Sequence, residues 1–155
     1  MKRTVWRIVK AKYAATAFSG EGAAKVGGRW NSRGQSVVYT SGTLSLAALE
    51  MLVHLQPPVP LAWIAIPCEF DESLAETLDE SVLPANWRQF PAPPGVRALG
   101  DAWLKEARTP VLSVPSVVVP QERNFLLNPA HPDFERLSIG AGEPFALDTR
   151  LPGVV

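Results

Sequence analysis

The sequence predicts an α+β fold built from many short elements in one domain. The chain has 155 residues, of which 46% are hydrophobic, enough for one globular core but too few for two comfortable domains. Short apolar runs of strand length alternate with two longer helical patterns. The 15 prolines are spread along the chain rather than gathered in a linker. We therefore expect residues 1–155 to form a single domain.

The first elements lie before residue 41. Thr4–Val9 is rich in β-branched and aromatic residues, which predicts a strand. The small residues of Ala14–Ala24 allow a short helix, and Val26–Gly28 predicts a turn. Ser36–Thr40 predicts a second short strand.

The clearest helix is Leu44–Leu55, which Thr40 or Ser41 could cap and which Pro57 ends. Apolar side chains surround almost its whole circumference, and this pattern predicts burial on most sides. The polar residues in its interior are Ser45, Glu50 and His54.

A third strand is expected at Leu61–Phe70, where Pro67 indicates an edge or a bulge. Asp71–Leu83 is acidic and helical or irregular, and the proline-rich Asn86–Gly95 predicts a loop. Val96–Arg108 has the period of an amphipathic helix. Its inward residues would be Leu99, Trp103 and Leu104.

The C-terminal third has weaker patterns. Thr109–Val119 resembles a strand broken by Pro115, and Asn124–Pro132 predicts a loop. Phe134–Ile139 is the last expected strand, and the tail from Gly140 has no assigned structure.

Composition excludes several classes of function. Lys and Arg together number 15 and balance 15 acidic residues, which argues against a protein that binds nucleic acid by bulk charge. The N-terminus lacks the apolar run of a signal peptide, and no apolar stretch reaches membrane-spanning length. We expect a cytoplasmic protein that contacts neither membrane nor DNA directly. The single cysteine, Cys68, lies in an apolar run and is expected to be a buried, inert thiol.

Three polar residues stand out between Gly27 and Glu50. Glu50 lies in an apolar helix, where a carboxylate is costly to bury unless it is paired. Arg29 follows two glycines, a position that suits bidentate binding of phosphate or carboxylate. Tyr39 offers a ring with a polar tip. Together they predict a pocket for a charged ligand that carries a ring.

Each of these residues also has a purely structural interpretation. Glu50 could be anchored to an arginine for packing, Arg29 could form a surface ion pair, and Tyr39 could be a core aromatic. Arg7 interrupts the first strand and needs an anionic partner, for which Glu50 or a ligand phosphate are the candidates. Glu50 and His54 have the spacing of a metal-binding pair, but a third ligand is not evident. Neither a P-loop, a GxGxxG fingerprint nor a GxSxG elbow occurs.

Six runs of residues together resemble one known family. They are WRI, GGRWNSRG, VVYTS, SLAALE, VPSVVVPQERNFLLNP and HPDF, from about Trp6 to Phe134. In order and content they resemble the RES domain, the toxin of RES–Xre type II toxin–antitoxin pairs. The resemblance implies a fold similar to diphtheria-toxin-like ADP-ribosyltransferases, with a split β-sheet surrounded by helices.

The resemblance also implies a substrate, a site and a partner. RES toxins act on NAD+, which is a substrate rather than a cofactor, and they need no metal. The pocket residues of the family match Arg7, Arg29, Tyr39 and Glu50, and Ser116 and Asn124 fall on later motifs. The expected partner is an Xre-family antitoxin whose helix-turn-helix part would contact DNA.

The chemistry of NAD+ cleavage fits these residue types. Glu50 would stabilise the oxocarbenium-like ribose, and the two arginines would hold the pyrophosphate or orient Glu50. Tyr39 would stack on nicotinamide. Ser116 would donate to the ribose, the nicotinamide or Glu50.

Three functions are consistent with this sequence. The first is a toxin that depletes NAD+ and arrests growth, the second is a toxin that ADP-ribosylates a cellular protein, and the third is a non-catalytic binding module. The sequence does not distinguish water, phosphate or protein as the acceptor of ADP-ribose.

Overall fold

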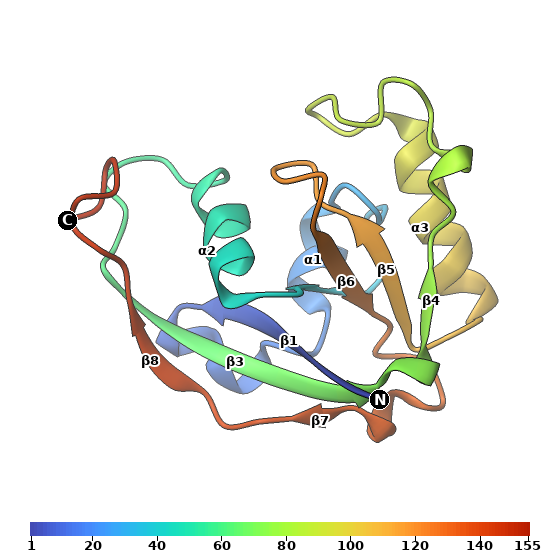
Figure 1. The fold of residues 1–155 in the computed structure, drawn as a ribbon, viewed down its shortest axis with the longest axis horizontal. Helices are drawn as coiled ribbons and strands as arrows, with labels where there is room; N and C mark the ends of the chain where they lie inside the picture. The colour runs from blue at the N-terminus through green and yellow to red at the C-terminus, as the bar shows by residue number, and fades with distance from the viewer.

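The computed structural model describes residues 1–155 as one curled sheet with helices around it (Figure 1). The strands are β1 (Lys2–Val9), β2 (Val38–Ser41), β3 (Ala62–Asp71), β4 (Ala75–Thr77), β5 (Val111–Pro115), β6 (Arg123–Leu127), β7 (Ser138–Ile139) and β8 (Glu143–Ala146). The α-helices are α1 (Glu21–Val26), α2 (Leu44–Leu52) and α3 (Pro94–Glu106). Four short 3-10 helices are η1 (Ala11–Thr16), η2 (Glu72–Leu74), η3 (Glu80–Val82) and η4 (Phe134–Arg136). The expected α+β class is confirmed.

The sheet has the strand order β4-β5-β6-β2-β1-β3-β7, and β8 also pairs with β3. All neighbours are antiparallel except β4 and β5, which run parallel. β1 pairs with β3 along its whole length, but it shares only the pair Trp6–Ser41 with β2. The sheet is therefore split between β1 and β2, as expected for this fold.

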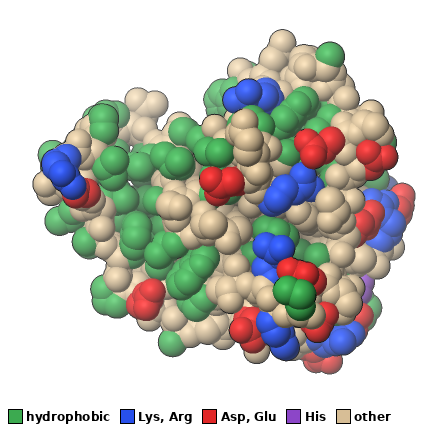
Figure 2. Space-filling view, in the orientation of Figure 1, with side chains coloured by type: hydrophobic (Ala, Val, Ile, Leu, Met, Phe, Trp, Pro, Cys, Tyr) green, Lys and Arg blue, Asp and Glu red, His purple; other side chains and the backbone are tan.

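The two halves of the sheet lie on different sides of the molecule. In Figure 1, β1, β3, β7 and β8 run along the bottom of the view, and β4, β5 and β6 stand on the right beside α3. Helix α2 rises between them. Figure 2 shows the surface hollowed at the top of the view, above α2 and beside the loop that precedes α3.

Three hydrophobic clusters hold these parts together. The largest lies on β1, β3 and β6, with the fully buried Val5 and Phe70 among its members. The second packs α3 on β5 and β6 through the fully buried Trp103. The third lies beneath α2 and includes Trp63 and Val154. No helix is long and apolar enough to cross a membrane.

Helix α2 differs from its expectation in two ways. Its N-cap is Thr43, whose Oγ1 accepts from the Leu46 amide at 3.1 Å, because Thr40 and Ser41 belong to β2. Leu46 is buried, but Leu49 is 43% exposed. The prediction that this helix is buried on most sides is therefore wrong, since only one face of α2 packs on the sheet.

Pro67 does not lie on a sheet edge, because β3 has β1 on one side and β7 and β8 on the other. The Pro67 carbonyl faces the second side and accepts from the Gly140 amide at 2.8 Å. β7 and β8 are separate strands, and the break between them lies opposite Pro67. The missing N–H therefore costs no ladder hydrogen bond.

The other expected elements have mixed outcomes. The strands β1 and β2, the loop before α3 and α3 itself are confirmed within a few residues, and Trp103 and Leu104 are buried as expected. β4 and β8 were not expected. The loop predicted at Asn124–Pro132 is wrong over its first part, which is β6. In Phe134–Ile139, only Ser138 and Ile139 are strand.

Candidate active site

A cavity of about 1120 Å³ opens where β1 and β2 separate. Its walls come from β1, β2, α2, the turn after α1, the loop before α3 and the start of β6. Five of the six expected site residues line it: Arg7, Arg29, Tyr39, Glu50 and Asn124. The sixth, Ser116, is fully buried behind Glu50 and contacts it directly. The fold therefore brings together residues from six separate parts of the sequence.

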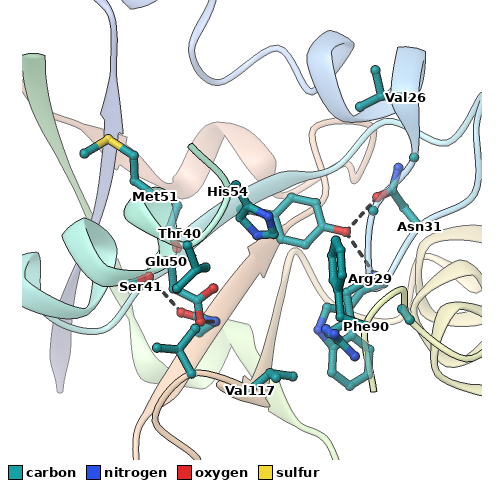
Figure 3. A pocket seen from close by; sticks show the side chains of 18 of the residues that line it. Val26, Arg29, Asn31, Thr40, Ser41, Glu50, Met51, His54, Phe90 and Val117 are labelled. Carbon is teal, nitrogen blue, oxygen red and sulfur yellow. Dashed lines mark hydrogen bonds between the residues drawn. The ribbon is translucent and has the colours of Figure 1, made fainter. Parts of the chain in front are cut away.

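Glu50 is half-buried in the cavity wall, and one of its carboxylate oxygens carries all its hydrogen bonds. Oε1 accepts from Ser116 Oγ and from Asn124 Nδ2, each at 2.7 Å. Figure 3 shows Glu50 in the cavity wall beside Thr40 and Ser41. Oε2 has no donor in the protein, and it is not among the buried atoms that lack a partner. Oε2 of Glu50 is therefore available to a ligand. The carboxylate forms no ion pair with an arginine, so it is not anchored for packing alone.

The two partners of Glu50 can only act as donors. Ser116 Oγ already accepts from the Val118 and Val119 amides at 3.1 and 3.0 Å, so its single hydrogen points to Glu50. Asn124 Oδ1 accepts from Ser41 Oγ at 2.7 Å, which leaves the Asn124 amide nitrogen facing Glu50. Two donors on Oε1 therefore fix the orientation of the carboxylate.

Tyr39 is held by its hydroxyl, which donates to Asn31 Oδ1 at 2.6 Å and accepts from the Trp30 amide at 3.1 Å. Burial is the main cause that raises the pKa of Tyr39, so the hydroxyl stays neutral. A Cβ at Gly28 would lie 2.6 Å from that hydroxyl oxygen. The glycine turn therefore serves close packing against Tyr39.

Arg7 does not pair with Glu50, so that part of the sequence prediction is wrong. Its Nη1 donates to the Tyr39 carbonyl at 3.1 Å, across the gap between β1 and β2. Its Nε is buried and has no partner, and no carboxylate lies within ion-pairing distance. Burial lowers the pKa of Arg7. The other candidate partner, a ligand phosphate, stays a prediction.

Arg29 is bound to the loop before α3 rather than to a carboxylate. Its Nη1 donates to the Trp87 carbonyl at 2.7 Å, and its Nη2 donates to the Gln89 carbonyl at 2.9 Å. Burial lowers the pKa of Arg29, and the nearby negative charge of Glu50 opposes this effect. Arg29 forms no surface ion pair and presents a second cation to the cavity.

Sequence reasoning missed the residues that hold the predicted ones. Asn31 is fully buried and fixes Tyr39, and its own amide donates to the Ala23 and Gln35 carbonyls. Asn31 follows Arg29 by two positions. The signal that the sequence offered was a polar residue close to a glycine turn. Ser41 lies opposite Asn124 in the β2–β6 register, which the loop prediction for that segment concealed.

Two other residues considered in the sequence, Cys68 and His54, take no part in these hydrogen bonds. Cys68 is fully buried in β3, and burial raises the pKa of its thiol to about 12, as expected for an inert cysteine. His54 lines the cavity near Glu50, but no group of three or more His, Cys, Asp or Glu side chains is arranged to hold a metal ion.

The family model described as "RES domain" matches residues 4–148. The chain therefore belongs to the RES domain family, and the resemblance drawn from its motifs is confirmed.

Curated relatives cover almost the whole chain. A protein of Yersinia enterocolitica named "Toxin Res" is 40% identical over 149 residues, covering 95% of this chain and 98% of its own. A Sphingobium protein named "Prs ADP-ribosylating toxin" is 38% identical, with coverages of 97% and 98%. A Pseudomonas putida "Toxin Res" is 35% identical, with coverages of 95% and 98%.

A solved structure shares the fold. It is the toxin–antitoxin complex MbcT–MbcA of M. tuberculosis, and it superposes with a TM-score of 0.71 over 94% of this chain and 85% of that chain. The sequence identity is 15%, so this likeness concerns the fold alone.

Proposed function

We propose that this chain is the toxin of a toxin–antitoxin pair and that it cleaves NAD+ at the nicotinamide–ribose bond. The toxin assignment rests on the family and on relatives named "Toxin Res". One observation carries the chemistry: the Glu50 carboxylate, fixed through Oε1 by two donors, has Oε2 free in a cavity that two unpaired arginines also line.

In the proposed step the bond between the ribose C1′ and the nicotinamide ring nitrogen of NAD+ breaks. Both bonding electrons go to the ring nitrogen, so nicotinamide leaves as a neutral molecule, and positive charge develops on the ribose. Glu50 Oε2 stabilises that charge or holds a ribose hydroxyl, as carboxylates do in glycoside cleavage. A nucleophile then bonds to C1′ and loses a proton. This step uses no metal ion.

The remaining groups fit the other parts of NAD+. The pyrophosphate carries two negative charges, and Arg7 and Arg29 are cations without a carboxylate partner. The Tyr39 ring would stack on nicotinamide. The cavity of about 1120 Å³ exceeds the range of about 300–1,000 Å³ that is usual for drug-sized ligands, which suits a dinucleotide.

The proposed partner is an antitoxin of the Xre type that covers the cavity. The support is the structural neighbour, which is the toxin of a toxin–antitoxin complex. DNA binding would belong to the antitoxin, in agreement with the balanced charge of this chain. The pair would act in the cytoplasm, where NAD+ loss arrests growth.

A second candidate function is transfer of ADP-ribose to a cellular protein. It is favoured by the 38% identical relative named "Prs ADP-ribosylating toxin". The bond that breaks and the role of Glu50 are the same, and only the nucleophile differs.

One time course separates these functions. The purified chain is incubated with NAD+, with and without phosphate and with and without cell extract, and the products are followed by mass spectrometry. Free ADP-ribose or its phosphate in the absence of extract supports NAD+ depletion. Turnover that requires extract and labels a protein supports ADP-ribosyl transfer. NAD+ that stays intact under all conditions contradicts both.

A further inference from the structure

The loop before α3 lines the cavity through Phe90, Pro91 and Ala92, and arginine side chains hold it there. Arg29 donates to the carbonyls of Trp87 and Gln89 at 2.7 and 2.9 Å, and Arg97 donates to the carbonyl of Ala92 at 3.3 Å. The loop is thus fixed at both ends by guanidinium groups from the cavity wall. Backbone carbonyls bound in this way have little freedom to move.

A further hydrogen bond from a guanidinium group joins the loop to the segment after β5. Arg88 Nη2 donates to the Val117 carbonyl at 3.0 Å, and Val117 lines the cavity beyond the end of β5. The loop is therefore bound to two parts of the cavity wall, to the turn after α1 through Arg29 and to the segment after β5 through Arg88.

The residue that this loop presents is Phe90, whose side chain is 77% exposed. Its ring packs against the His54 ring, with centroids 6.0 Å apart and planes tilted by 50° (Figure 3). Both rings line the cavity. His54 follows Glu50 by four positions and lies in the turn just after α2.

An exposed phenylalanine on a firmly held loop has no role in the core. Phe90 belongs to none of the three hydrophobic clusters, so the bonds that fix its backbone do not serve to bury it. They hold an aromatic ring beside a cavity that the charged side chains of Arg7, Arg29 and Glu50 also line. This arrangement suits contact with a flat ring that enters beside His54.

We propose that Phe90, paired with His54, determines specificity by stacking on a planar heteroaromatic ring of the substrate. The inference rests on the proposed function in that NAD+ supplies two such rings, nicotinamide and adenine. Because Phe90 is 77% exposed, its free face can pack against the entering ring while it stays beside His54. Arg29 keeps three of its five N–H donors free while it holds the loop, so it can bind phosphate at the same time.

The test measures binding separately from turnover. In a Glu50→Gln background, calorimetry gives the Kd of NAD+ for the parent and for Phe90→Ala, Phe90→Leu and Phe90→Trp. Loss of one stacking partner weakens base binding by about tenfold, so Phe90→Ala and Phe90→Leu should raise Kd by about that factor. Phe90→Trp keeps an aromatic ring and should keep the Kd of the parent. Val82→Ala, at an apolar residue that is 51% exposed and lies outside the cavity, is the control and leaves Kd unchanged.

Titration with nicotinamide mononucleotide and with ADP-ribose identifies the ring. The ligand whose affinity falls in Phe90→Ala carries the contacted ring. A Kd that is the same in Phe90→Ala as in the parent overturns the inference, and so does a Phe90→Leu variant that binds as the parent does.

The proposed function fails by a different result. It fails if the wild-type chain leaves NAD+ intact, and a Kd that still depends on the Phe90 ring would then preserve the inference for a ring-bearing ligand.

Discussion

Ser116 Oγ donates to Glu50 Oε1 at 2.7 Å, although the two residues are 66 positions apart in the sequence. Glu50 comes from α2, and Ser116 comes from the end of β5, on the other side of the split in the sheet. The candidate carboxylate is therefore positioned by both halves of the molecule. Changes that loosen either half should affect activity before they unfold the protein.

Ser41 should act as a positioning residue for Glu50 through Asn124. Ser41→Ala removes the donor that orients the Asn124 amide, and we expect kcat for NAD+ to fall about 3–10-fold, consistent with one hydrogen bond of about 1 kcal/mol. Ser41→Thr keeps the hydroxyl and should retain kcat. Asn124→Asp places a second carboxylate against Oε1 and should lose more activity than Ser41→Ala. Wild-type kcat in folded Ser41→Ala would contradict this role.

Gly28 should be needed for the close approach of Tyr39. Gly28→Ala places a Cβ 2.6 Å from the Tyr39 hydroxyl oxygen, which is too close, and should destabilise the fold by about 1–3 kcal/mol. Tyr39→Phe removes that oxygen, so the double variant should lose less stability than the sum of the two single variants. Urea unfolding of the four proteins measures this coupling, and strict additivity would refute it. Gly22→Ala, where a Cβ meets nothing within 4 Å, is the control.

Arg7 should lower the unfolding free energy of the free protein and contribute to substrate binding. Its guanidinium is largely buried, its Nε has no partner, and burial lowers its pKa. Arg7→Met removes a desolvated cation, so unfolding free energy should be unchanged or rise by about 1–2 kcal/mol. The KM for NAD+ should rise about tenfold, because a charge-assisted phosphate contact is lost. A destabilised variant with unchanged KM would show that Arg7 has only a structural role.

Cys68 should make stability depend on alkaline pH. Burial raises the pKa of its thiol to about 12, above the ordinary 9.0 that it regains on unfolding. The stabilising contribution is thus complete below about pH 9 and is lost as pH rises toward 12, by at most 1.4 kcal/mol per pH unit. Between pH 8 and 10.5 the wild type should lose more unfolding free energy than Cys68→Ala does. Equal losses would contradict a buried thiol.

Local patterns predicted those elements that depend on nearby residues. The β-branched run of β1, the glycine turn at Gly27 and the amphipathic period of α3 all persist in the fold. Burial of α2 could not be inferred from composition, because its apolar outer face lies at the rim of the cavity. β6 looked like a loop because Asn124 and Asn128 flank only three apolar residues.

The candidate site was predictable as a set of residues but not as a network. Tyr39 and Glu50 stood out as polar groups in apolar segments, and Arg29 stood out because it follows a glycine turn. Their partners depend on strand pairing: Ser41 contacts Asn124 only because β2 and β6 are neighbours. The link from Arg29 to the loop before α3 spans about 60 positions and leaves no pattern in the sequence.

The most direct test of the proposed function compares Glu50→Gln with the wild type for NAD+ consumption. Glutamine retains an oxygen that can accept from Ser116 and Asn124, so the melting temperature should stay within about 3 °C. The free oxygen, however, becomes an uncharged amide. We predict that the rate of NAD+ loss falls by about 10²–10³-fold. A folded Glu50→Gln protein that consumes NAD+ at the wild-type rate would contradict the central role of this carboxylate.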